Sequence, residues 1–225
     1  MKKFISIVLL GDSDISRWPP SLYPECRNVH TSVINYGQSG AILSDLLLQL
    51  QKWRIERQDM YNSCDVTNVF VVCAGENDLG LRRSIDSLLD TLRSFLDELF
   101  PNSQLQQIQQ STPKSYLLFL GPKFEPWLTD DISNRKQYVK LSNALNRTIH
   151  KHPGFCNNQM IFIDCVTMFC TRETSSIPGA VYGGKALPKT EYFDRDGLHL
   201  SEEGYRIWKG TIETELNRIS SRDTN

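Results

Sequence analysis

The strongest constraint on the fold is a set of short apolar runs that alternate with longer segments of helical periodicity. The runs cover 4–10, 68–74, 116–120 and 160–164, and 29–36 contains a weaker one. Such runs, rich in β-branched residues, are typical of strands buried on both faces of a parallel sheet. Apolar residues recur at helical spacing over 42–53, 85–99, 133–150 and 202–219, with Ser201 as the expected N-cap of the last helix. This alternation predicts an α/β fold, a three-layer α/β/α sandwich with a five-stranded, mainly parallel sheet.

The length of the chain favours one domain. With 225 residues it can bury roughly 70% of the surface that its unfolded form exposes, so it needs no disulfide or metal cross-links to fold. We expect a single domain over 1–225, with the last few residues disordered, and loops over 102–114 and 171–190. The six cysteines form no Cys-x-x-Cys pair, and we expect them to be reduced thiols.

Composition and the N-terminus narrow the class of partner. The formal net charge of −1 gives no sign of a nucleic-acid footprint. Lys2 and Lys3 before an apolar stretch imitate a signal peptide, but no small-residue cleavage site follows, and a first strand explains the run better. No stretch approaches the roughly 18 apolar residues of a membrane span. These features predict a cytoplasmic protein that acts on a small molecule.

Polar, turn-forming clusters follow three of the predicted strands, and a fourth precedes the last helix. They are Gly11-Asp12-Ser13, then Asn35-Tyr36-Gly37-Gln38-Ser39-Gly40, then Gly75-Glu76-Asn77-Asp78, and finally Asp196-Gly197-Leu198-His199. In open α/β sheets, ligands bind beyond the carboxyl ends of the strands. We therefore expect these four clusters to converge on one edge of the sheet.

The residue types in these clusters suit acyl transfer. A serine hydroxyl needs a neighbouring base to become a good nucleophile, and His199 is the candidate base for Ser13. Asp196 lies three residues earlier, where it can accept the other imidazole N–H and fix the tautomer. The backbone N–H groups of Gly40 and Ser13, with the side-chain amide of Asn77, are the candidate donors for an oxyanion hole.

The four clusters together resemble the SGNH hydrolase family, also known as GDSL-like lipases and esterases. In that family the blocks Gly-Asp-Ser, an oxyanion glycine, Gly-x-Asn-Asp and Asp-x-x-His occur in this order, so the resemblance spans nearly the whole chain. It implies a serine esterase that forms an acyl-enzyme on Ser13, without metal or cofactor. It also implies oxyanion-hole roles for Gly40 and Asn77 and supporting roles for Asp12 and Asp78. Short acyl or acetyl groups are the favoured substrates.

Two positions depart from the family pattern or leave a choice. The family usually has an apolar residue after Gly-Asp-Ser, and here Asp14 stands there. An extra carboxylate beside the nucleophile would disfavour anionic substrates or change how Ser13 is presented. The oxyanion glycine is Gly40 or Gly37.

Other interpretations of the same residues remain open. Ser13 could be a helix N-cap, and Asn77-Asp78 a simple turn. Trp18 and Trp127 could line a substrate cleft or pack in the core, and the segment 123–127 could shape the pocket.

Two other activities remain open as well. Asp12 and Asp14 after an apolar strand resemble the Asp-x-Asp of magnesium-dependent phosphohydrolases, in which carboxylates hold the metal. An acyltransferase would use the same Ser13 triad as an esterase.

Overall fold

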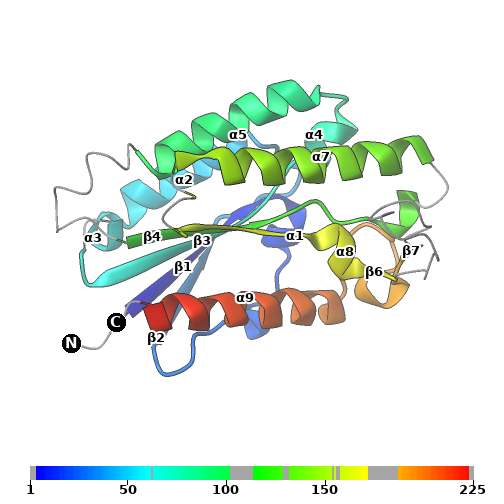
Figure 1. Ribbon diagram of the computed structural model, residues 1–225. Helices are drawn as coiled ribbons and strands as arrows, with labels where there is room; N and C mark the ends of the chain where they lie inside the picture. Colours follow the sequence, from blue (N-terminus) through cyan, green and yellow to red (C-terminus); the bar gives the residue numbers. More distant parts are fainter. Residues whose placement is uncertain are drawn as a thin grey trace.

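Five parallel strands form the central sheet, in the order β2-β1-β3-β4-β5 (Figure 1). The computed structural model describes residues 4–61, 63–101, 114–128, 132–153, 155, 158–171 and 187–222. The strands are β1 (Phe4–Gly11), β2 (His30–Asn35), β3 (Val66–Cys73), β4 (Lys114–Leu120) and β5 (Met160–Ile163). Every neighbouring pair is parallel. The predicted α/β fold with a five-stranded parallel sheet is confirmed.

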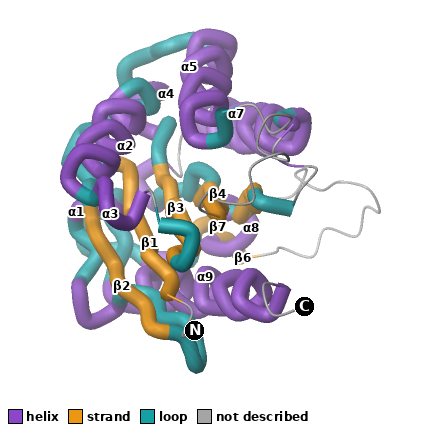
Figure 2. The backbone as a smooth tube through the Cα atoms, turned by 90° about the vertical axis from the view of Figure 1, so that its left-hand side faces the viewer, coloured by secondary structure: helices purple, strands orange, loops and turns teal. Residues whose placement is uncertain are grey.

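Helices cover both faces of this sheet, as Figures 1 and 2 show. One face carries α2 (Asp45–Glu56), α5 (Ile85–Leu99) and α7 (Ile132–Lys151), and the other carries α9 (Glu202–Arg222). Shorter elements lie between them. They are α1 (Ser13–Ser16), η1 (Pro20–Leu22), α3 (Gln58–Tyr61), α4 (Glu76–Gly80), η2 (Pro126–Leu128), α8 (Cys165–Phe169), η4 (Thr190–Tyr192) and the two-stranded ladder of β6 (Cys170–Thr171) with β7 (Leu187–Pro188).

The alternation of side chains along the strands divides the core into two layers. In β1, Ile5, Ile7 and Leu9 pack with the apolar face of α9, whereas Val8 and Leu10 pack with α2, α5 and α7. Successive side chains of a strand point to opposite faces, so a strand buried on both sides is apolar at most positions, and Ser6 is a buried polar exception in β1. This is why the central strands appear in the sequence as nearly continuous apolar runs, whereas the half-buried edge strand β2 gives a weaker one.

Several element boundaries differ from the sequence prediction for local reasons. Helix α2 begins at Asp45 instead of 42, because the Asp45 carboxylate accepts a hydrogen bond from the Ile42 N–H at 2.8 Å and ends the preceding turn. The predicted loop 171–190 contributes Thr171 and Leu187 to the β6–β7 ladder at its two ends. The rest of that loop, 172–186, lies outside the described residues, as does 102–113.

The expected N-cap of the last helix is present, because the Ser201 hydroxyl oxygen accepts a hydrogen bond from the Gly204 N–H at 3.3 Å. Five cysteines are free thiols, of which Cys64 is exposed; Cys156 lies outside the described residues. Across the described ranges, none of the helices combines the length and the apolarity that crossing a bilayer requires.

Candidate active site

A cavity of about 460 Å³ opens at the carboxyl ends of the strands. Ser13, Gly40 and Asn77, which come from three of the four motif clusters, all line it, and Leu198 of the fourth cluster lines it as well. The other lining residues are Asp12, Glu76, Leu79, Gly80, Leu81, Lys123, Glu125, Trp127, Gln137 and Tyr138. The structure therefore brings the predicted oxyanion donors and the predicted nucleophile to one space.

Ser13 begins the short helix α1 directly after β1. Gly11 closes the strand where a side chain would not fit, because a Cβ there would lie 2.1 Å from the Cys73 carbonyl oxygen. The buried side chain of Gln49 makes two hydrogen bonds to the backbone of Gly11. It accepts one from the Gly11 N–H at 2.7 Å and donates one to the Gly11 carbonyl at 2.9 Å. Asp12, not Ser13, caps the helix by accepting a hydrogen bond from the Asp14 N–H. The Ser13 hydroxyl is thus not consumed as the N-cap of this helix.

The loop after β2 distinguishes the two candidate oxyanion glycines. The Gly37 N–H donates to the Asn35 side-chain oxygen at 2.8 Å, so it closes a turn. Gly40 lines the cavity with a φ of 77°, in the left-handed region that favours glycine. Asn77 donates from its side-chain amide to the Ala41 carbonyl at 2.9 Å, which ties the start of α4 to the Gly40 turn. These contacts favour Gly40 over Gly37 as the backbone donor.

Asp196 and His199 form a close side-chain pair on the turn before α9. The His199 Nδ1 lies 2.6 Å from the Asp196 Oδ2, and the other carboxylate oxygen accepts from the backbone N–H groups of Leu198 and His199. Burial alone would raise the pKa of Asp196, but these hydrogen bonds hold it well below its usual range. Asp196 therefore stays ionised and fixes the His199 tautomer that bears a proton on Nδ1, with Nε2 free to accept one.

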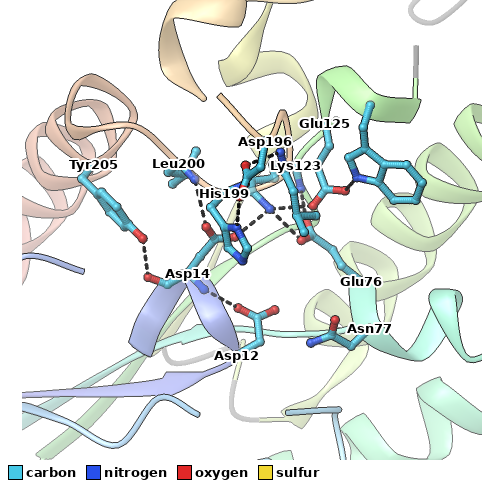
Figure 3. Close-up of polar contacts among 12 residues, drawn as sticks. Asp12, Asp14, Glu76, Asn77, Lys123, Glu125, Asp196, His199, Leu200 and Tyr205 are labelled. Atoms are coloured by element: carbon cyan, nitrogen blue, oxygen red, sulfur yellow. Dashed lines mark hydrogen bonds and ion pairs between the residues drawn. The ribbon is translucent and has the colours of Figure 1, made fainter. Parts of the chain in front are cut away.

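A group of buried charges lies beneath the cavity. The Lys123 ammonium is 2.6 Å from the Asp14 carboxylate and 2.8 Å from each of the Glu76 and Glu125 carboxylates (Figure 3). Burial opposes the charged form of Lys123, but the three carboxylates raise its pKa well above its usual range. Burial also opposes the charged form of Glu76, and for a carboxyl group this raises the pKa. The sequence had singled out 123–127 as a pocket segment, but nothing local to it indicates this ion cluster.

Asp12 directly precedes Ser13, and its ionisation is expected to affect stability. Burial, and next the charge of Asp14, raise the pKa of Asp12 to about 7. A raised native pKa means that the folded state holds the proton more tightly than the unfolded state does. The proton on Asp12 therefore stabilises the folded state. This contribution is complete below the unfolded pKa near 4 and is lost as the pH rises through the folded pKa of about 7.

We expect the substitution Asp12→Asn to flatten this part of the pH dependence. An asparagine oxygen can still cap α1, but it cannot titrate. Between pH 5 and pH 7 the free energy of unfolding of the wild type should fall by about 2 kcal/mol more than that of the variant, measured by urea denaturation. Asp65→Asn, an exposed site, serves as the control and should keep the wild-type slope. Parallel slopes for wild type and Asp12→Asn would disprove this assignment.

The remaining sequence candidates have clear positions. Asp78 is buried and accepts a hydrogen bond from the Leu43 N–H at 2.9 Å, so it supports the turn that leads into α2. Trp127 is 59% exposed and lines the cavity. Trp18, by contrast, is only 1% exposed and packs against Trp208 and Tyr205, so of the two interpretations left open for it the structure supports core packing. The Trp18 indole lies in the core because it packs against the apolar face of α9 near the beginning of that helix.

Comparison with known proteins bears on the family of the chain. A search of curated proteins finds no match. Among solved structures, a lipase/acylhydrolase from Enterococcus faecalis is 19% identical, with a TM-score of 0.60 over 94% of this chain and 95% of the other. A catalytic mutant of an acetylxylan esterase from Geobacillus stearothermophilus is 16% identical, with a TM-score of 0.60 over 96% of each chain. A carbohydrate esterase of family 3 from Talaromyces cellulolyticus is 14% identical, with a TM-score of 0.56 over 96% and 97%.

At these identities the solved structures establish a shared fold, and the family itself is shown by the sequence. The model of the family described as GDSL-like Lipase/Acylhydrolase matches residues 7–209, which includes all four motif clusters. The resemblance stated from the motifs is thereby confirmed, and so is the prediction of an enzyme of the ester hydrolase class. This chain belongs to the family of GDSL-like lipases and acylhydrolases.

Proposed function

We propose that this protein hydrolyses carboxylic esters through an acyl-enzyme on Ser13. The observation that carries the proposal is the shared cavity, in which Ser13 lies with Gly40 and Asn77. The base is the His199 imidazole, which is paired with Asp196 through Nδ1. Nucleophile, base, orienting carboxylate and oxyanion donors are the parts that acyl transfer requires.

The reaction consists of two acyl transfers with the same proton movements. The Ser13 Oγ attacks the ester carbonyl carbon while the His199 Nε2 takes its proton, and Asp196 stabilises the imidazolium that forms. The tetrahedral intermediate collapses, the bond to the alcohol oxygen breaks, and His199 returns the proton to that oxygen. Water then attacks the acyl-enzyme in the same way, and the carboxylic acid leaves as the Ser13 hydroxyl is restored.

The negative oxygen of each tetrahedral intermediate needs donors that are already in place. Asn77 has two amide protons, and the Ala41 carbonyl accepts one of them at 2.9 Å. The second proton, together with the backbone N–H groups of Gly40 and Ser13, would meet the oxyanion. Each such donor is worth about 2.7–4 kcal/mol of the barrier, because it acts where water is excluded.

The cavity favours esters with a short acyl group. Its volume of about 460 Å³ must hold both the acyl group and part of the alcohol, and pockets for drug-sized ligands span roughly 300–1,000 Å³. By their names, the similar structures include an acetylxylan esterase and a carbohydrate esterase, which supports an acetylated sugar as the substrate that we propose. The exposed indole of Trp127 offers a flat apolar surface for such an alcohol.

Asp14, the second aspartate that a magnesium-dependent phosphohydrolase would need, has other partners. One Asp14 oxygen faces the Lys123 ammonium at 2.6 Å and the other accepts the Leu200 N–H at 3.1 Å, so neither is directed to a metal ion. In the described part of the chain, no group of three or more His, Cys, Asp or Glu side chains is arranged to hold a metal.

A substrate panel with and without a chelator tests the proposal. Purified protein is assayed with p-nitrophenyl acetate, butyrate and octanoate, with p-nitrophenyl phosphate, and with an acetylated sugar, each with and without EDTA. We expect hydrolysis of the acetate and butyrate esters, weaker hydrolysis of the octanoate, and no effect of EDTA. Phosphate release that EDTA abolishes would overturn the proposal in favour of the phosphohydrolase. Transfer of the acetyl group to an added alcohol in preference to water would instead identify an acyltransferase that uses the same residues.

A further inference from the structure

Asp14, the residue that departs from the family pattern, makes long-range contacts with the end of the chain. One of its carboxylate oxygens accepts a hydrogen bond from the Leu200 N–H at 3.1 Å. Its backbone carbonyl accepts a hydrogen bond from the Tyr205 hydroxyl at 2.8 Å. Asp14 is 1% exposed, so these contacts are shielded from water. They join α1 directly to the turn before α9 and to the start of α9 itself, as Figure 3 shows.

The second carboxylate oxygen of Asp14 is fixed by Lys123. An ammonium group has three protons to donate, and the Lys123 Nζ has three carboxylate partners, in Asp14, Glu76 and Glu125, at 2.6, 2.8 and 2.8 Å. The Glu76 carboxylate also accepts the Lys123 backbone N–H at 2.6 Å. Lys123 is 1% exposed. With every proton of the ammonium directed at an acceptor, the orientation of the Asp14 carboxylate is tightly constrained.

These contacts involve the immediate neighbours of the two residues that the proposed reaction depends on. Asp14 follows Ser13 in the chain, and Leu200 follows His199. A hydrogen bond between Asp14 and Leu200 therefore sets how the backbone that carries the nucleophile lies against the backbone that carries the base. A leucine or isoleucine at position 14 would have no acceptor for the Leu200 N–H and no partner for Lys123.

We propose that Asp14 is a positioning residue, which is held by Lys123 and fixes the His199 turn against the helix that carries Ser13. This inference rests on the proposed function, because it assigns Asp14 a role through His199 and none in contact with substrate. In general, a displacement of about 1 Å between reacting groups costs about 10²-fold in rate. The role of Asp14 should therefore appear in kcat, while KM for a small ester stays near the wild-type value.

Two substitutions separate the contact of Asp14 with Leu200 from its contact with Lys123. Asp14→Ala removes both contacts, and we expect kcat for p-nitrophenyl acetate to fall about 10²-fold. Asp14→Asn keeps an oxygen for the Leu200 N–H but loses the attraction of Lys123, and we expect a fall of about 10-fold. Ser84→Ala is the matched control for lost stability, because Ser84 caps α5 through the Ser87 N–H and is not among the residues that line the cavity. That variant should lower the melting temperature and leave kcat unchanged.

A double-mutant cycle with His199→Ala provides the decisive readout. If Asp14 acts by positioning His199, then Asp14→Ala or Asp14→Asn should change the residual rate of the His199→Ala protein by less than about 2-fold. A loss of the same factor in both backgrounds would mean that Asp14 acts independently of His199, and would overturn the inference. An unchanged kcat in Asp14→Asn would also overturn the inference. If Asp14→Ala does not fold, Asp14→Asn alone is used for this test.

The same measurements distinguish this inference from the proposed function. If His199→Ala retains wild-type turnover, the proposed function itself is wrong. If His199→Ala is inactive but the Asp14 variants keep the full kcat of the wild type, only the positioning role is wrong.

Discussion

Replacement of Ser13 by alanine is expected to abolish ester hydrolysis, with a fall in kcat of about 10⁴- to 10⁶-fold. Without the hydroxyl no acyl-enzyme can form, and what remains is catalysis by the oxyanion donors acting on water. The fold should be unaffected, because Ser13 is the first residue of α1 and the cap of that helix is supplied by Asp12. The measurement is the initial rate with p-nitrophenyl acetate at saturating substrate, compared with the melting temperature of the same preparation.

The chain supplies its own control for this substitution. Ser16 lies in the same short helix, three residues later, and is exposed to solvent. Ser16→Ala therefore makes the same chemical change on the same element, away from the cavity, and should leave kcat and the melting temperature unchanged. Wild-type turnover in Ser13→Ala would remove Ser13 from the mechanism, and an equal loss in both variants would indicate damage to α1.

Replacement of His199 by alanine is expected to have an effect of similar size, because a serine hydroxyl is a poor nucleophile until a base takes its proton. We expect kcat to fall about 10⁴-fold or more, since the members of a triad act as a unit. Added imidazole should restore part of the rate, because it can enter the space that the side chain leaves and accept the Ser13 proton. No restoration is expected in Ser13→Ala.

His150→Ala is the control for the histidine substitution, since His150 is exposed at the end of α7. It should behave as wild type with and without imidazole. Imidazole that stimulates wild type and His199→Ala to the same extent would show that it acts on the ester directly. In that case the assignment of His199 as the base would fail.

The strands of the sheet could be predicted from the sequence because burial on both faces requires a run of mostly apolar residues. β1 and β3 are flanked by helices on both sides, so most of their positions are apolar, with Ser6 and Asn68 as buried polar exceptions. The site could be found because its parts occur at strand ends, where Gly11 and Gly40 accompany the polar residues. Both signals are local, and both depend on the residue types that the local structure requires.

The contacts that tie the site together could not be predicted, because they join residues far apart in sequence. Asp14 bonds to Leu200, 186 residues later, and Lys123 meets Glu76 at a separation of 47. Nothing around Lys123 distinguishes a buried ammonium with three partners from an ordinary surface lysine. The choice between cleft and core for Trp18 stayed open for the same reason, since its packing against Trp208 depends on where α9 lies.

The most direct test of the account is covalent labelling with a serine-directed fluorophosphonate, followed by intact-mass measurement and peptide mapping. The Ser13 oxygen would attack phosphorus and expel fluoride, leaving a stable phosphonyl ester in place of the acyl group. The account predicts one adduct per chain on the peptide that contains Ser13, no adduct in Ser13→Ala, and much slower labelling in His199→Ala. An adduct on another residue, or an active esterase that the probe neither labels nor inhibits, would contradict it.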